Sequence, residues 1–299
     1  MKSKQTQGML AALATNLIFG FSFLFSKMAI AVAHPLTVLA VRFTVAFAAL
    51  NILWLCGAAK PRFRGKKYGR LLLMSVAQPL CYFVLELYGI SLTSSALSGI
   101  IIALVPVAVA LICAFLPEKP NGKQYLCAAV SLAGIIAISL LAENEGENKL
   151  LGIVLLAGAV IAAAAFNLLS RREAAAFSPF ERTYVMFLIG TVGFHGIAFA
   201  AQRETYITEL QKAAVSPTFW VAILYLAVVS SVAAFMLYNF ATSHISAVRS
   251  ASFSNIIPVI SVLAGVFIMD EPFSLWEILL CIPVLLGVWG VNRFGETKA

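Results

Sequence analysis

Two apolar stretches of the sequence indicate how the chain is built: residues 8–27, GMLAALATNLIFGFSFLFSK, and residues 152–171, GIVLLAGAVIAAAAFNLLSR. Each is an apolar run of about the 20 residues that an α-helix needs to cross a bilayer. The two runs also align at a constant offset of 144, with matches at Gly8/Gly152, Leu24/Leu168, Ser26/Ser170 and Lys27/Arg171. They predict membrane-spanning helices at the start of two related halves.

The composition supports a membrane protein. Of the 299 residues, 61% are hydrophobic and 11% are charged, and the mean hydropathy is +0.94, whereas soluble domains carry about 25% charged residues. Soluble enzymes, secreted disulfide scaffolds and nucleic-acid-binding proteins are therefore excluded. The five cysteines lie in apolar runs without a Cys-x-x-Cys motif, and the three histidines are far apart. We expect no metal site and no cofactor.

Ten apolar segments are long enough to span a membrane as helices. They cover residues 8–32, 36–57, 71–91, 95–116, 124–142, 150–169, 183–200, 217–239, 246–268 and 274–292. The first is longer than the apolar core of a signal peptide and is interrupted by Lys27, which argues against cleavage. Because the longest remaining stretch is 201–216, the sequence predicts an all-α polytopic membrane protein with no soluble domain.

The distribution of basic residues predicts the orientation. If the N-terminus is cytoplasmic, 15 of the 21 Lys and Arg residues lie on the cytoplasmic side and 3 on the other, and Lys27, Arg42 and Arg249 lie within spans. Positive residues favour the cytoplasmic side, so we expect both termini there, in a multi-pass protein of the cell membrane. The net charge of +8 then reflects topology and contact with lipid, and requires no nucleic acid.

The relationship between the halves continues further along the chain. At an offset of 152, Ser94 matches Ser246, Ser98 matches Ser250 and Pro106 matches Pro258. The halves 1–145 and 146–299 each contain five predicted spans, an odd number, so the second half enters the membrane from the opposite side. Such inverted repeats are typical of secondary transporters, whose substrate sites lie near the midplane.

Several motifs carry a resemblance to a known family. They are Gly20-Phe21-Ser22 with Lys27, Val41-Arg42-Phe43, Tyr88–Ala96 with Pro106 and Glu118, and, in the second half, Ser246–Arg249, Pro258 and Asp270-Glu271-Pro272. With these motifs the whole chain resembles the drug/metabolite transporter superfamily, in particular its ten-helix EamA type. The resemblance implies a 5+5 helix bundle that exports small metabolites or drugs by alternating access.

Three ionisable residues are candidates for the substrate site. Lys27, Arg42 and Glu86 come from three different spans but share a depth of some 5–10 Å inside the outer boundary, at about 1.5 Å per residue. Ionisable groups at such depths cost about 2.5–3.5 kcal/mol each on insertion scales and are functional suspects. We expect an inward-facing Arg42–Glu86 pair with Lys27 nearby. The alternative is that these side chains, Lys27 above all, snorkel to the interface.

Other residues could line a central cavity enclosed by spans one, two, three, four, six, eight and nine. Phe19, Phe23 and Tyr82 would supply apolar and stacking surface. The polar residues near mid-span, each equally suited to helix–helix hydrogen bonds, are Asn16, Gln78, Tyr82, Ser98, Asn167, Ser252 and Asn255. Pro106 and Pro258 are expected to kink helices and free the carbonyl groups of Ile102 and Ser254, although prolines are also common in membrane helices.

The sequence therefore favours a secondary transporter of a small metabolite or drug-like compound, such as an amino acid or a related molecule. Proton coupling through Glu86 is one hypothesis, which an adjacent Arg42 would oppose by favouring the charged carboxylate. A passive facilitator or channel of the same fold is the first alternative. An intramembrane enzyme would need a paired nucleophile and base, which the sequence does not contain, and a receptor of transporter ancestry is a further alternative.

The orientation can be tested by labelling a cysteine at position 66. In a Lys66→Cys variant, a membrane-impermeant thiol reagent should react only from the cytoplasmic side, because Lys66 belongs to the basic segment between the second and third spans. Labelling from the outside would overturn the predicted topology.

Overall fold

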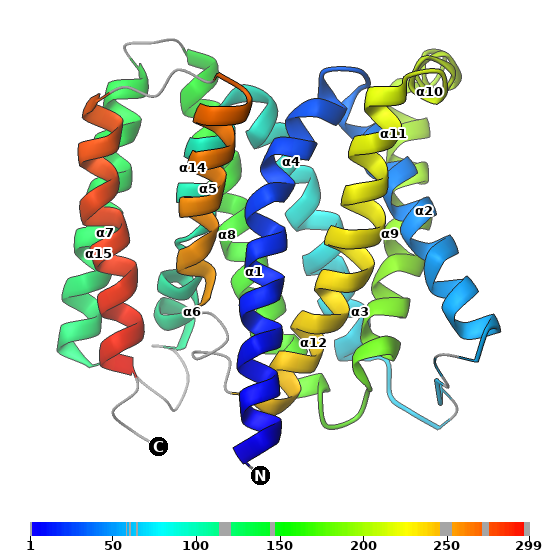
Figure 1. Ribbon diagram of the computed structural model, residues 1–299, viewed down its shortest axis with the longest axis horizontal. Helices are drawn as coiled ribbons and strands as arrows, with labels where there is room; N and C mark the ends of the chain where they lie inside the picture. Colours follow the sequence, from blue (N-terminus) through cyan, green and yellow to red (C-terminus); the bar gives the residue numbers. More distant parts are fainter. Residues whose placement is uncertain are drawn as a thin grey trace.

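The structure is a computed structural model that describes residues 2–57, 59, 61–63, 65–113, 121–143, 147–245, 253–270 and 275–295. Every regular element in these ranges is helical (Figure 1). In a bilayer a single-chain helix satisfies its own backbone hydrogen bonds, so the apolar runs fold as the sequence predicts. The prediction of an all-helical, polytopic membrane protein is confirmed.

In the first half the helices follow the predicted spans closely. Their bounds are α1 (Lys2–Ile30), α2 (Pro35–Leu55), α3 (Gly69–Ser75), the π-helical segment η1 (Val76–Cys81), α4 (Tyr82–Leu92), α5 (Ser95–Ile102), α6 (Val105–Cys113) and α7 (Gly122–Glu143).

The described part of the second half includes a short helix, α10, in the stretch 201–216 that was expected to be a loop. The bounds in this half are α8 (Glu147–Glu173), α9 (Pro179–Gln202), α10 (Tyr206–Ala214), α11 (Pro217–Leu224), the π-helical segment η2 (Tyr225–Ala233), α12 (Ala234–His244), the 3₁₀ turn η3 (Phe253–Asn255), α14 (Ile256–Ile268) and α15 (Leu275–Gly295).

Six helical stretches are long and apolar enough to cross a membrane. They are Lys4–Ile30, Pro35–Leu55, Gly69–Leu92, Leu150–Glu173, Pro179–Gln202 and Pro217–His244. Shorter apolar helices cover Leu97–Ile112, Ile256–Ile268 and Ile278–Val291. These nine stretches lie on nine of the ten predicted spans, and α7 covers the remaining one, 124–142.

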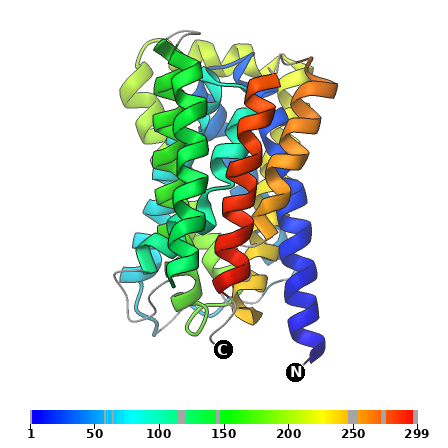
Figure 2. The same cartoon turned by 90° about the vertical axis from the view of Figure 1, so that its left-hand side faces the viewer.

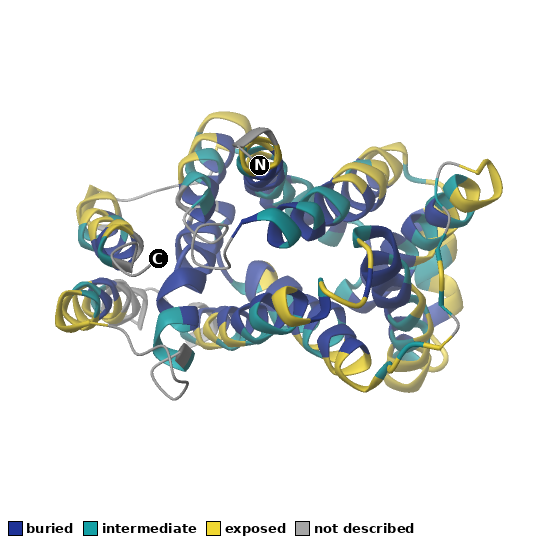
Figure 3. Cartoon of the chain, turned by 90° about the horizontal axis from the view of Figure 1, so that it is seen from below, coloured by how far each residue is buried: buried dark blue, intermediate teal, exposed yellow. Residues whose placement is uncertain are grey.

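The helices stand side by side in an upright bundle. The start of α1 and the end of α15 lie at the same end of it (Figure 1). We call this the N-terminal end, and the other, where α10 lies, the far end. Helices α7 and α15 pack against each other at one edge (Figure 2). Seen along the helices, buried residues face the interior and exposed ones the periphery (Figure 3), as expected for a bundle surrounded by lipid.

Pro106 and Pro258 both lie near the start of a helix in this structure. The fourth predicted span is not one kinked helix: it is broken at Ala103 and Leu104, and Pro106 lies in the first turn of α6. Pro258 likewise lies in the first turn of α14, after η3. The irregularity expected near Pro106 is thus an interruption between two helices. The reason is that proline lacks an amide proton and is tolerated where a helix begins.

One basic residue outside the predicted spans is buried. Arg182, one of the 15 residues that the predicted orientation places on the cytoplasmic side, lies in the first turns of α9 and is 0% exposed. The helix begins earlier than its apolar run, because Ser178 and Glu181 form a capping box and Pro179 occupies its first turn. This combination nucleates a helix start.

Two glycines allow α15 to approach α7 closely. A Cβ atom on Gly287 would lie 2.5 Å from the carbonyl oxygen of Cys127 and 2.7 Å from the amide nitrogen of Ser131. On Gly290 it would lie 2.4 Å from the Cys127 Sγ atom. The Gly-x-x-Gly spacing thus serves helix–helix contact, as small residues do in membranes.

The close approach predicts the effect of adding one methyl group. We expect Gly287→Ala to destabilise the protein by about 1–3 kcal/mol, the usual cost of overpacking, measured as a lower melting temperature in detergent. Gly196→Ala in α9 is the matched control, because its Cβ would meet nothing within 4 Å and alanine favours helix. Equal melting temperatures for the two variants would contradict the contact.

Candidate functional site

A cavity lies inside the bundle among seven of the predicted spans. Its volume is about 80 Å³, measured as the space open to the centres of water molecules, and one water needs only about 10–15 Å³ by this measure. Its walls come from α1, α2, η1 with α4, α5 with α6, α8, η2 with α12, and η3 with α14. These segments correspond to spans one, two, three, four, six, eight and nine, so the space can hold a small solute.

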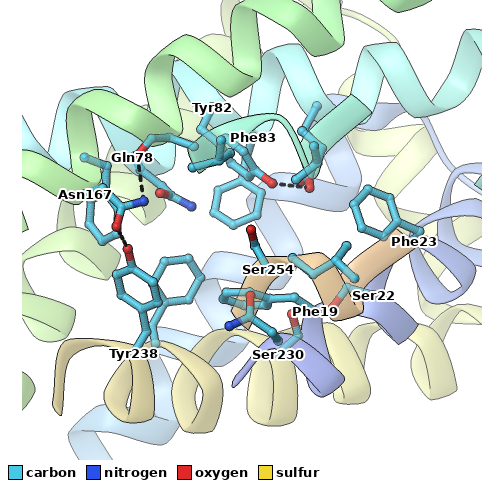
Figure 4. Close-up of a pocket in the computed structure, with 18 of the residues that line it drawn as sticks. Phe19, Ser22, Phe23, Gln78, Tyr82, Phe83, Asn167, Ser230, Tyr238 and Ser254 are labelled. Atoms are coloured by element: carbon cyan, nitrogen blue, oxygen red, sulfur yellow. Dashed lines mark hydrogen bonds between the residues drawn. The ribbon is translucent and has the colours of Figure 1, made fainter. Parts of the chain in front are cut away.

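Eight of the residues proposed from the sequence line this cavity. They are Asn16, Phe19, Phe23, Arg42, Gln78, Tyr82, Glu86 and Asn167. Figure 4 shows several of them around the open space, with Tyr82 and Phe83 opposite Ser230 and Phe19. The remaining wall is formed by Ser22, Phe83, Ile102, Val105, Ala163, Phe166, Ser230, Phe235, Tyr238, Ser254 and Ile257.

Arg42 is held by the opposite half of the chain. It is 2% exposed. Its Nε atom donates a hydrogen bond to the Ser231 Oγ atom at 3.0 Å, and an Nη atom donates to Ser230 Oγ at 3.3 Å. Its guanidinium also lies 4.4 Å from the ring centroid of Phe83, within the range of a cation–π contact. Two hydroxyls and an aromatic face thus orient the charge.

Glu86 is held separately. Its carboxylate accepts a hydrogen bond from the Tyr82 hydroxyl at 2.6 Å, one helical turn away. Arg42 and Glu86, both within the described part of the chain, form no ion pair within 4 Å. The expected direct pair is therefore corrected: the two charges share the cavity, but the guanidinium is turned toward the serines of η2. Each charge keeps the capacity to meet a ligand.

Neutral polar groups occupy the wall formed by α8 and α12. The Tyr238 hydroxyl donates a hydrogen bond to the Asn167 side-chain oxygen (Figure 4).

On the first-half wall, Gln78 interrupts the helix with an extended backbone (φ −144°, ψ 114°), just before Pro79. Because proline cannot continue the hydrogen-bond ladder, the sequence itself places this irregularity beside the cavity.

Lys27 and Ser98, which the structure describes, have other partners and are not among the residues that line the cavity. The Lys27 ammonium donates to the carbonyl oxygen of Thr93. The Ser98 hydroxyl contacts that of Thr93 at 2.8 Å, which is the helix–helix hydrogen bond considered as its alternative role. Ser252 and Arg249 lie outside the described residues, and so does the side chain of Asn255.

Three of the residues that sequence reasoning missed, Ala163, Ser230 and Tyr238, are related by the offsets of the internal alignment to residues that it found. All lining residues except Asn16, Arg42 and Tyr82 fall into matched pairs. At an offset of 144 the pairs are Phe19/Ala163, Ser22/Phe166 and Phe23/Asn167; at 152 they are Gln78/Ser230, Phe83/Phe235, Glu86/Tyr238, Ile102/Ser254 and Val105/Ile257. Applying the offsets to Gln78 and Glu86 would have identified Ser230 and Tyr238.

Comparison with known proteins identifies the family. The model of the EamA-like transporter family matches residues 6–140 and again residues 150–293. The chain belongs to the EamA-like transporter family. The match and the apolar helices together make it a multi-pass membrane protein, as the sequence predicted.

Relatives of this EamA-like protein are named as transporters. The chain is 31% identical to the uncharacterized transporter YcxC of Bacillus subtilis, over 100% of this chain and 96% of the relative. It is 26% identical to the uncharacterized transporter YetK of the same organism, over 91% and 82% of the two chains. An uncharacterized transporter of Archaeoglobus fulgidus is 21% identical, over 93% and 96%. These names support a transporter role.

The fold of the EamA-like chain also resembles a solved structure. A protein whose title reads "Crystal structure of protein" superposes with a TM-score of 0.67 and 16% sequence identity, over 99% of this chain and 100% of that one. At this identity the likeness concerns the fold alone.

The contact between Arg42 and Ser231 can be measured with a double-mutant cycle. We expect Ser231→Ala to lower stability by about 1.5 kcal/mol in the natural chain, a typical value for a hydrogen bond to a charged group. In an Arg42→Met background the same change should cost much less, because the donor is gone. Thermal unfolding of the four variants gives the coupling; equal costs in both backgrounds would contradict the contact.

Proposed function

We propose that this EamA-like protein is a secondary transporter that exports a small metabolite or drug-like compound, such as an amino acid or a related molecule, across the cell membrane by alternating access. The observation that carries this proposal is the cavity, in which one cation and one carboxylate are held apart from each other by separate partners. An amphipathic solute could use both charges and the aromatic walls.

Alternating access around this cavity requires two halves that move relative to one another. We take these as 1–145 and 146–299, inverted, with both termini cytoplasmic. Two observations support the repeat: the family model matches the chain twice, at 6–140 and 150–293, and the lining residues pair at the offsets 144 and 152. Equivalent positions in both halves thus contribute to one cavity.

The charges break this equivalence and indicate the class of substrate. The position matching Arg42 is Met186, and the position matching Glu86 is Tyr238. Both charged groups therefore come from the first half, whereas Asn167, Ser230 and Tyr238 make the second-half wall uncharged and polar. A zwitterion fits this arrangement: its carboxylate would meet Arg42, its ammonium Glu86, and its remaining surface the aromatic rings.

Proton coupling is part of the same proposal. Arg42 does not form an ion pair with Glu86, and among the described residues the Tyr82 hydroxyl is the one group that donates a hydrogen bond to this carboxylate. A proton and a substrate ammonium could then compete for it, which is the exchange that a proton-driven exporter needs. A passive facilitator of the same fold would not need such competition.

Two substitutions test the site. We expect Arg42→Ala and Glu86→Gln each to lower transport about tenfold or more, since each removes a charged contact worth about 1.5 kcal/mol or above. Substrate export is measured in proteoliposomes, with a candidate substrate found by thermal shift among amino acids, nucleosides and cationic drugs. Glu86→Gln should also remove the response to an imposed pH gradient.

The matched control is Lys123→Ala in α7, an exposed cation outside the cavity, which should transport normally. Full activity of both cavity variants would remove Arg42 and Glu86 from the site. Accelerated exchange in the presence of unlabelled substrate on the far side supports a carrier; its absence in active protein would favour a channel.

A further inference from the structure

In each half of the chain, a basic side chain at the end of the first helix donates a hydrogen bond to a carbonyl oxygen at the end of the third span. In the first half, the Lys27 ammonium, in the last turn of α1, donates to the carbonyl oxygen of Thr93 at the end of α4. In the second half, an Arg171 Nη atom, in the last turn of α8, donates to the carbonyl oxygen of Thr242 at 2.7 Å, in the last turn of α12. Lys27 and Arg171 are matched at the offset of 144.

The chemistry of helix ends explains why a cation binds there. The last four carbonyl groups of a helix lack amide partners within the helix and carry a partial negative charge. A Lys or Arg side chain from a neighbouring helix satisfies one of these oxygens and neutralises the charge. The contact involves no side-chain carboxylate, so it can break without leaving a buried anion.

The two contacts lie at opposite ends of the bundle. Helix α1 starts at the N-terminal end and finishes at the far end, so Lys27 is at the far end (Figure 1). Helix α12 finishes at the N-terminal end, and the Arg171–Thr242 contact is there with it (Figure 1). One contact of this kind therefore lies toward each face of the membrane.

Each contact lies one helical turn beyond the cavity wall. Phe23 and Asn167, which line the cavity, precede Lys27 and Arg171 by four residues. Tyr238, also in the wall, precedes Thr242 by four. A separation of α1 from α4, or of α8 from α12, would open the wall toward the corresponding end.

At the N-terminal end, a second basic residue also joins α8 to α12. Arg182 of α9, fully buried, donates to the carbonyl oxygen of Ser170 at 2.8 Å and to Ser243 Oγ at 2.7 Å, and it also donates to the carbonyl oxygen of Asn239. It thus joins α8 and α12 a second time. The end with the Arg171 contact is therefore held by two cations.

We propose that the Lys27–Thr93 and Arg171–Thr242 contacts are a pair of latches that are released in turn, so that the cavity opens to one side of the membrane at a time. Lys27 and Arg171 are then positioning residues for transport. This rests on the proposed alternating-access function but concerns the opening of the cavity, which can be observed without a known substrate.

The test uses a single cysteine in the cavity wall, Ala163→Cys, in a chain whose five natural cysteines are replaced. A membrane-impermeant thiol reagent is applied to right-side-out and to inverted vesicles. We expect Lys27→Met to raise the labelling rate about threefold from the face at the far end only, since a cation at a helix end contributes modestly. Arg171→Met should raise it from the opposite face only, and by less, because Arg182 still holds α8 to α12.

Three comparisons make the result specific. Lys27→Arg and Arg171→Lys keep the cation and should restore the natural labelling pattern. Arg172→Met removes the neighbouring exposed charge of α8 and should change nothing. Thermal unfolding of each variant shows whether it folds. If a methionine variant does not fold, Lys27→Gln or Arg171→Gln replaces it.

Opposite sidedness for the two variants supports the latches. Equal increases from both faces, or no change in folded variants, overturns them. This result is independent of the transport assay. If the two variants are labelled faster from opposite faces but the protein transports no solute, the latches are supported and the exporter is rejected. If the protein transports solute but the labelling of the variants is unchanged, the exporter is supported and the latches are rejected.

Discussion

Burying the guanidinium of Arg42 inside an apolar bundle is the constraint on which the centre of this structure depends. A charge at this depth is costly unless polar groups surround it, and here those groups come from the other half of the chain, as Ser230 and Ser231 of η2. The first half supplies the charge and the second supplies its hydrogen-bond acceptors. The contact thereby joins the two halves across the cavity, and neither half can hold the charge alone.

The same contact separates cation from carboxylate. Because the serines bind Arg42, Glu86 is left to Tyr82, its own neighbour along α4. A direct pair would have neutralised the cavity and left only its aromatic walls for recognition. Because the two charges are held separately, the cavity contains both a positive and a negative group, and its walls include the rings of Phe83, Phe166 and Phe235. In a low-dielectric interior such charges attract a complementary solute more strongly than they would in water.

The sequence predicted those features that depend on one dimension, along the membrane normal. Apolar length defines a span, and residue counting gives a depth, so the sequence could predict the helical spans and could select Arg42 and Glu86, which line one cavity. Depth does not give the rotation of a helix, which is why the partners of Arg42 were not predicted and why Ser98 had two possible roles, of which the structure shows the hydrogen bond to Thr93. Hydropathy places the start of the seventh span at residue 183, whereas the capping box at Ser178 starts α9 at Pro179, so hydropathy did not predict the burial of Arg182.

Irregular helix geometry is concentrated where the cavity requires it. The extended backbone at Gln78, the π-helical η2 that presents Ser230, and the break between α5 and α6 beside Ile102 all lie in the cavity wall. Non-helical backbone at membrane depth is tolerated where it is enclosed by protein or lines a cavity, and π-helical turns often occur at functional sites. The described residues of α7 and α15, by contrast, contribute nothing to the lining of the cavity. The sequence therefore confines its departures from ideal helix to the segments that surround the charges, which is the pattern expected if these segments, and not the peripheral pair, bind and release the solute.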